Sequence, residues 1–393
     1  MDILKKITDS AKEKFAALPF PHRKDEYWRF ADLKAWNADG VFDFFCSSKP
    51  RKGESSLDDS VCRGAQLCVA DGQLLDVPQI SGLKILTMRE ASEKYPEKIE
   101  KFFASASGKF DVLQAARADY GVFVEVADGA EVSLEMSVVN KLNVSAFGAF
   151  FALGRGASLA LKKTTLTFGG SLSTARFGFD LSDGARLVYA QTKNSEACAR
   201  MFEREDFSVA SDCEVIDAMA QTGLSHSRSE RNFEILGERS DIDSRVFLKT
   251  RSDITADLRT RQIHHSESSK SNLQVKAALY DDSAIAFTGL IDVCTAAQKT
   301  EAYQSCRSLL LSDRAKSQAS PILEISANDV MCSHGCTVAE PDKEELFYMF
   351  QRGLDEKRAL DMVVESFAGT TFEKIPAHAF AAADTDSADA QNA

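Results

Sequence analysis

A near-constant repeat in the middle of the chain restricts its fold more than any other feature. Between about residues 120 and 325, short segments of alternating apolar and polar residues follow turns made of small or acidic residues. Corresponding positions in four successive segments lie 27, 28 and 28 residues apart: Ala130, Ala157, Ala185 and Cys213. Similar turns at residues 239–242, 282–285 and 314–316 continue the repeat with looser spacing. A fixed period of this length predicts a solenoid, in which similar units stack along one axis.

Each repeat unit is expected to hold two or three β-strands. The segments are rich in Val, Phe, Leu and Thr interleaved with polar residues, as in residues 246–250. No single unit can bury its apolar face alone, so the units should stack into a β-helix with a continuous core. A β-sandwich with evenly spaced turns is the alternative. We predict a mainly β chain with a β-helix core over residues 120–325.

Residues 1–119 predict a mainly helical module. Apolar residues at helical spacing precede a break at residues 18–21, and Pro96 should divide a second helical segment over residues 88–103. The Asp71-Gly72 pair predicts a tight hairpin turn, since it suits positive φ. Trp28, bracketed by charges, could line a binding surface. We favour an aromatic anchor that fixes its segment to the body.

Residues 326–375 predict a C-terminal helical region. Asp342 is placed as an N-cap, and Gly353 is placed to end the first helix. A second helix should open at Asp355 and stop before Gly369. Residues 376–393 are mostly Ala, Asp, Ser and Thr, and this composition predicts a disordered tail.

Composition excludes several classes of function. The formal net charge of −12 argues against a nucleic-acid binder and against an acidic membrane surface as partner. The first residues lack the apolar core of a signal peptide, and no apolar run could span a bilayer, so we expect a cytoplasmic protein. Nine cysteines without a regular framework then predict small core residues rather than disulfides. The chain also lacks the phosphate-binding loop, the dinucleotide-binding fingerprint and the Gly-x-Ser-x-Gly nucleophile motif.

The segment at residues 330–337 carries the densest group of metal-binding side chains. If it is extended, Cys332, His334 and Cys336 share one face, because side chains of a strand repeat every two residues. Thiolate and imidazole are ligands for iron, zinc or an iron–sulfur cluster. A closed site needs about four ligands, and no second Cys/His cluster occurs in the sequence. Buried thiols near a turn are therefore the alternative.

The remaining histidines favour structural or surface roles. His264 and His265 are adjacent, so only one of them can face the core of an alternating strand. His226 is flanked by serines, with arginine close by. Neither place suggests a ligand set.

Three stretches resemble the SufB/SufD family, the scaffold proteins of the SUF iron–sulfur assembly system: residues 300–312, 321–325 and 347–353. Two further segments resemble the SufD branch of that family in particular. These are Cys332-Ser333-His334-Gly335, followed by Thr337, and residues 28–33. The resemblance covers nearly the whole chain.

The resemblance implies a right-handed β-helix between N-terminal and C-terminal helices, and a scaffold rather than an enzyme. It implies pairing with a SufB-like subunit through the β-helix, and docking of a SufC-like ATPase on the C-terminal helices. A transient iron–sulfur cluster would form at the SufB–SufD interface, with His334 as first candidate ligand and Cys332 as second. The candidate ATPase-binding residues are Leu346, Phe347, Tyr348, Phe350 and Arg352.

Some alternatives stay open at this point. Cys336 stands where the family usually has a small alanine-like residue, so it is either an additional thiol or a filler of the same small volume, and we favour the filler. Cluster type, flavin binding, the recipient of the cluster and a homodimer are not decided by the sequence. The competing hypothesis is a metal-dependent hydrolase on a β-helix fold, which would need a full ligand set and an acid–base pair in this one chain.

Overall fold

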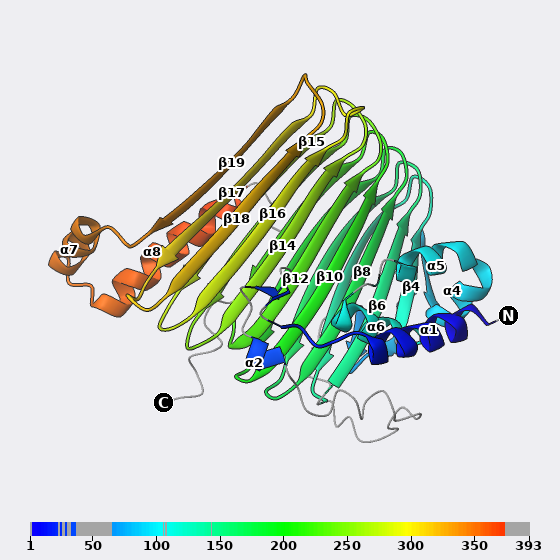
Figure 1. The fold of residues 1–393 in the computed structure, drawn as a ribbon, viewed down its shortest axis with the longest axis horizontal. Helices are drawn as coiled ribbons and strands as arrows, with labels where there is room; N and C mark the ends of the chain where they lie inside the picture. The colour runs from blue at the N-terminus through cyan, green and yellow to red at the C-terminus, as the bar shows by residue number, and fades with distance from the viewer. Residues whose placement is uncertain are drawn as a thin grey trace.

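The computed structural model describes residues 2–22, 24–25, 28–29, 33–36, 65–104, 106, 108–142 and 144–373. Within these residues the chain forms a long solenoid of β-strands with helices at both ends (Figure 1). Residues 47–60, whose polar composition predicts a loop or linker, lie outside the described residues, as does the predicted tail at residues 376–393.

Two sheets form the solenoid. The first sheet has, in spatial order, β19 (Met331–Ala339), β17 (Glu301–Leu310), β15 (Lys270–Leu279), β13 (Asp241–Thr250), β11 (Glu214–Gln221), β9 (Arg186–Ser195), β7 (Ser158–Thr167), β5 (Glu131–Asn140), β1 (Leu67–Ala70) and β2 (Gln73–Asp76). The second sheet has β18 (Lys316–Ile325), β16 (Ala284–Val293), β14 (Thr255–His264), β12 (Ser225–Ile235), β10 (Ala199–Val209), β8 (Leu172–Leu181), β6 (Val144–Leu153), β4 (Gly121–Val126) and β3 (Leu83–Thr87). From β4 onward, successive strands alternate between the two sheets (Figure 1).

Parallel pairing between neighbouring turns confirms the predicted solenoid, which has about eight turns. β10, for example, pairs in parallel with β8 on one side and with β12 on the other, without a register shift. Each turn contributes one strand to each sheet. A repeat unit therefore has two strands, the lower of the two numbers expected from the sequence. A period near 28 is therefore two strands of about ten residues joined by two short turns.

The turns explain why small and acidic residues recur at the same place. Gly129, Gly156, Gly184 and Asp212 occupy equivalent turn positions with φ between 58° and 72°. This left-handed region is open to glycine and, at moderate cost, to aspartate. The residue that follows is small and lies at the corner of the interior, where Ala157 and Ala185 are fully buried. Turn chemistry and corner packing together generate the period seen in the sequence.

Stacked aromatic rings fill part of the interior along the second sheet. Phe151, Phe179, Phe207 and Phe233 occupy matching positions on four successive strands. Their ring centroids are 5.1, 4.7 and 4.5 Å apart, with interplanar angles of 9° to 14°. In-register parallel pairing places identical side chains directly above one another, so each ring packs on the ring of the next turn.

The N-terminal helices cover the second sheet (Figure 1). They are α1 (Ile3–Ala17), α2 (Leu33–Trp36), α4 (Met88–Lys94), α5 (Pro96–Ala104) and α6 (Lys109–Ala115). Trp28 is buried against Trp36 and Phe110, and the Arg228 guanidinium lies 4.1 Å from its ring centroid. The predicted aromatic anchor is confirmed. The hairpin turn at Asp71 and the helix break at Pro96 are also where the sequence predicted them.

The C-terminal region differs from its prediction in two respects. β19 is a strand of the solenoid, although it lies beyond residue 325, in the segment expected to be helical. The last helix, α8 (Glu356–Phe372), runs through Gly369 instead of ending before it. Its Val364 packs against Phe247, Ala278 and Leu309 of the first sheet, so tertiary packing outweighs the low helix propensity of glycine. The preceding helix, α7 (Lys343–Gln351), begins after the N-cap Asp342 as expected.

Cys68 is disulfide-bonded, so the expectation of no disulfides is wrong at this position. Six other cysteines of the described chain carry free thiols: Cys198, Cys213, Cys294, Cys306, Cys332 and Cys336. Among the described residues, no helix combines the length and the apolar character needed to cross a bilayer.

The aromatic stack predicts a large loss of stability for Phe207→Ala. Phe207 is 1% exposed and contacts rings on both sides, so truncation should lower the free energy of unfolding by about 3–5 kcal/mol. Phe347→Ala, on the exposed helix α7, is the control and should change it by less than about 0.5 kcal/mol. Urea titration of both variants measures the difference. Similar losses would contradict the assignment of the stack to the core.

Candidate functional site

The outermost strand of the first sheet carries the Cys/His segment. β19 is extended, so Cys332, His334 and Cys336 share one face, as predicted. β19 pairs in parallel with β17, and the three residues lie beside Ala302, Gln304 and Cys306. Those β17 residues are buried and face the interior of the solenoid. The Cys/His face is therefore a continuation of the interior into the last turn.

This last turn is open on one side. β19 and β18 are the end strands of their sheets among the described residues, so each keeps one backbone edge without a strand partner there. His334 and Cys336 are exposed, and Cys332 is half-buried against the interior cluster that includes Ile291 and Val293. An open edge of this kind is suited to pairing with another chain. We call β18 and β19, with the side chains that face between them, the mouth of the solenoid. At the mouth, side chains that continue the interior face are exposed to solvent.

Partial or full burial raises the pKa of the thiols in and behind the mouth. It raises the pKa of Cys332, an effect that the backbone N–H of Ala302 partly offsets, and it raises the pKa of Cys336 as well. The pKa of Cys306 is raised to about 12, by burial first and by the neighbouring Cys336 second. A thiol in this state becomes a thiolate ligand when a metal ion or another positive charge approaches it.

Two residues of β17 that lie directly behind the mouth were not singled out from the sequence. Cys306 lies beside Cys336, and Gln304 lies beside His334, because β17 and β19 are in register. The Gln304 amide donates to the Gly289 carbonyl at 3.1 Å, and its buried Oε1 has no hydrogen-bond partner. Alternation within residues 301–310 marks these side chains as inward-facing. Their neighbours are fixed only by the pairing of strands thirty residues apart.

The Cys/His face does not form a closed metal site in this structure. In the described part of the chain, no group of three His, Cys, Asp or Glu side chains is placed to hold a metal ion. A closed site needs about four ligands, so this face would supply only some of them.

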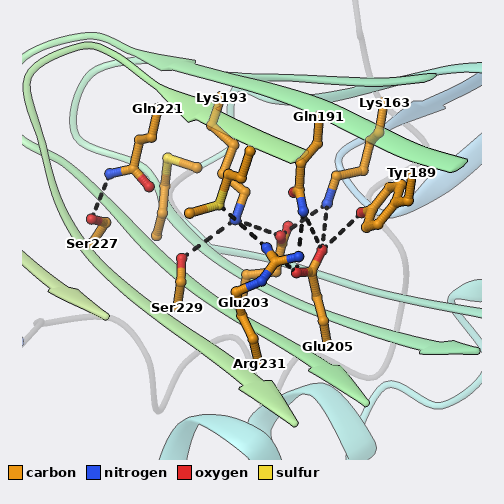
Figure 2. Close-up of polar contacts among 12 residues, drawn as sticks. Lys163, Tyr189, Gln191, Lys193, Glu203, Glu205, Gln221, Ser227, Ser229 and Arg231 are labelled. Atoms are coloured by element: carbon orange, nitrogen blue, oxygen red, sulfur yellow. Dashed lines mark hydrogen bonds and ion pairs between the residues drawn. The ribbon is translucent and has the colours of Figure 1, made fainter. Parts of the chain in front are cut away.

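A second polar cluster lies deep in the solenoid, at the level of β7 to β12. Figure 2 shows side chains from both sheets meeting across the interior. Glu203 accepts ion pairs from Lys163 at 2.9 Å and from Lys193 at 2.6 Å. Glu205 pairs with Arg231 at 2.5 Å, and Arg231 also contacts Asp217. We call these six residues the interior charge cluster.

Opposite charges balance within the interior charge cluster. Its three cations and three carboxylates are all at most 6% exposed in their side chains. Burial alone would raise the pKa of Glu205, but Arg231, Lys163 and Lys193 hold it well below its usual range. Tyr189 and Gln191 donate to the same carboxylate at 2.8 and 3.0 Å. The cluster is an internal salt-bridge network, in which each charge is compensated by another element of the solenoid.

The sequence of this chain matches a known protein family. A family model described as "SUF system FeS cluster assembly, SufBD core domain" matches residues 144–367, more than half of the chain. The chain belongs to the SufBD family. The matched part includes the interior charge cluster, the mouth and α7.

Several named relatives agree with this assignment. The iron–sulfur cluster assembly protein SufD of Escherichia coli (strain K12) is 28% identical over 201 residues, covering 51% of this chain and 48% of that protein. SufD of Bacillus subtilis (strain 168) is 25% identical over 195 residues, covering 49% and 45%. The match therefore spans about half the length of each SufD protein. "Protein ABCI7, chloroplastic" of Arabidopsis thaliana is 23% identical over 422 aligned positions, covering 95% of this chain and 83% of that protein.

In this SufBD chain, α7 presents an exposed aromatic surface. No residue of α7 is buried, and the helix projects beyond the solenoid (Figure 1). Phe347, Tyr348 and Phe350 are 61%, 56% and 40% exposed, while Leu346 is half-buried. The Arg352 guanidinium lies 5.1 Å from the Tyr348 ring centroid. Aromatic and arginine side chains of this kind are enriched where proteins bind one another.

The histidine pair divides as the alternation predicts. His264 is fully buried, its Nε2 lies 2.8 Å from the Ser271 hydroxyl, and burial lowers its pKa to about 4. His264 is therefore neutral and structural at physiological pH. His265 lies on the outer surface beside Glu234. His226 is half-buried, and its Nδ1 accepts a hydrogen bond from the backbone N–H of Thr255 at 3.3 Å.

The interior charge cluster predicts that Lys163→Met destabilises the SufBD solenoid. The variant leaves three buried carboxylates facing two cations, which should lower the free energy of unfolding by about 3–5 kcal/mol. Lys162→Met is the matched control, because the adjacent Lys162 makes only a surface pair with Glu135 at 3.8 Å, worth about 0–1 kcal/mol. Urea titration compares them, and equal losses would contradict the burial argument.

Proposed function

We propose that this chain is a SufD-type scaffold subunit of an iron–sulfur assembly complex. It would pair with a SufB-like subunit at the mouth and dock a SufC-like ATPase on α7 and α8. The observation that carries the proposal is His334 on the outermost strand, within the SufD-like sequence Cys332-Ser333-His334-Gly335. The SufD names of two relatives support the same branch.

The mouth has the properties expected of a subunit interface. Its strand edges are open among the described residues, and four apolar side chains around it are exposed: Ile322, Ile325, Met331 and Val338. A SufB-like partner that paired there would bury this apolar surface and bring its own ligands opposite His334. The transient cluster, as cargo, would then be held by His334 and by partner thiols, with Cys332 as second ligand of this chain.

ATP hydrolysis would take place in the SufC-like partner, and this chain would transmit the resulting motion. α8 packs on β13 and β15, and Lys276 of β15 donates to the Phe367 carbonyl at 2.9 Å. A displacement of α7 would therefore pass through α8 into the sheet that ends in β19. The cytoplasmic location expected from the sequence is part of the same proposal, whereas flavin binding and a homodimer stay open.

His334→Ala should lose cluster assembly and keep the fold. His334 is exposed on an edge strand, so its removal should cost less than about 0.5 kcal/mol of stability. Loss of a ligand should lower the cluster yield of the reconstituted complex by about tenfold or more. Absorbance of the complex with SufB-like and SufC-like partners measures the yield.

Ser333→Ala is the matched control for this experiment, since Ser333 lies on the opposite face of the same strand and is also exposed. Full cluster yield with His334→Ala would remove His334 from its role. The metal content of the isolated chain separates the hydrolase alternative: tightly bound stoichiometric zinc or iron would favour an enzyme, and a cluster gained only with partners would favour the scaffold.

The double variant Phe347→Ala/Tyr348→Ala should weaken ATPase docking without unfolding the chain. Both side chains are largely exposed, and aromatic anchors of an interface are worth about 2 kcal/mol or more, roughly thirtyfold in Kd. Calorimetric titration with the SufC-like partner gives the Kd. Deleting residues 342–375 should also abolish docking, but it would in addition expose the part of the first sheet that α8 covers. Leu142→Ala, which removes an exposed apolar side chain just after β5, is the control, and an unchanged Kd for the double variant would refute the docking surface.

A further inference from the structure

A cysteine, a histidine and a glutamate line up on the outer surface of the second sheet, beginning one strand in from the mouth strand β18. Glu234 lies in β12, His265 directly follows β14, and Cys294 directly follows β16. The His265 N–H bonds to the Ile235 carbonyl and the Cys294 N–H to the His264 carbonyl, each at 3.0 Å. Because His264 and Val293 point into the interior, the next residues His265 and Cys294 point outward.

The contacts among the three side chains define one tautomer of His265. Its Nε2 lies 2.7 Å from the Glu234 carboxylate, and its Nδ1 lies 3.7 Å from the Cys294 sulfur. A carboxylate only accepts hydrogen bonds, so Nε2 carries the proton and donates a hydrogen bond to Glu234. When His265 is neutral, the lone pair of Nδ1 therefore faces the Cys294 thiol. A nucleophile next to a base that a third group orients is the general arrangement for nucleophilic activation.

We propose that Cys294 is a base-assisted nucleophilic thiol that accepts sulfur from a disulfide or persulfide. His265 Nδ1 takes the thiol proton as the Cys294 sulfur attacks the electrophilic sulfur, and Glu234 stabilises the imidazolium that forms. A new S–S bond forms to Cys294, and the S–S bond of the donor breaks. The leaving thiolate takes the proton from His265. Cys294 is oxidised, and the leaving sulfur is reduced to a thiol.

The surroundings of Cys294 make the base necessary. Burial, and then the charges of Asp292 and Glu234, raise the pKa of the thiol, so it rests in its protonated form. A thiol in that state reacts slowly unless a neighbouring base removes the proton during the attack. The side chains of His265 and Glu234 are each 40% exposed, so a small sulfur donor can approach. None of the three residues belongs to β18 or β19, so their reactivity can be measured on this chain without a cluster or a partner.

The test measures the modification rate of individual cysteines in the full chain. The chain is incubated with oxidised glutathione in one experiment and with glutathione persulfide in another, and each cysteine is followed by peptide mass spectrometry. Cys198, on an exposed turn, is the reference thiol, and the buried Cys213 reports any unfolding. The adduct mass distinguishes a glutathionyl group from a single added sulfur, and so identifies the donor class.

Cys294 should react at least about tenfold faster than Cys198 with one or both donors, a modest share of the rate that general-base catalysis supplies. His265→Gln should remove that advantage, and Glu234→Gln should reduce it, while Cys198 reacts at its original rate in both variants. A Cys294 rate no greater than that of Cys198, or one unchanged in His265→Gln, would overturn the proposal. Cys294→Ser confirms the site of the adduct.

Discussion

Parallel pairing between one turn and the next is the interaction on which the rest of the structure depends. Every strand from β5 to β17 has a strand partner on each side, and the register runs without a shift through the solenoid. This pairing satisfies the backbone polar groups and holds equivalent side chains in line along the axis. The phenylalanine stack, the turn glycines and the outer Cys–His–Glu line are all consequences of that one register.

The same constraint explains why an interaction site is expected at the end of the solenoid. Stacking is satisfied for an inner turn, but the last turn has only one neighbour, so its edge and inner face stay open within the described chain. Polar and thiol side chains that would be costly in the middle of an apolar core can lie there at the surface. His334 and Cys336 occupy this position, and Cys306 lies one turn inside it. Membership in the SufBD family and the ligand chemistry of these residues both favour an interaction site at this end of the solenoid.

The interior charge cluster shows a different use of the register. Three carboxylates and three cations are taken out of water, which is tolerable only because strands of both sheets supply the partners. Figure 2 shows this arrangement for Glu203, Glu205 and the three cations. A shift of one turn would separate Glu205 from Arg231 and leave charges unpaired. The observed register is therefore the one in which these buried charges compensate one another.

The sequence by itself determined the features that depend on short-range chemistry. These include the repeat, the turn residues, the N-cap Asp342 and the shared face of Cys332, His334 and Cys336, because turns, caps and strand alternation follow from residues close together in the chain. Local signals failed where packing outweighed them, as at Gly369 inside α8, and where a strand followed residue 325. Only the tertiary structure decided which residues meet. Cys306 with Cys336, Gln304 with His334, and His265 with Cys294 are about thirty residues apart, and the strand register alone brings them together.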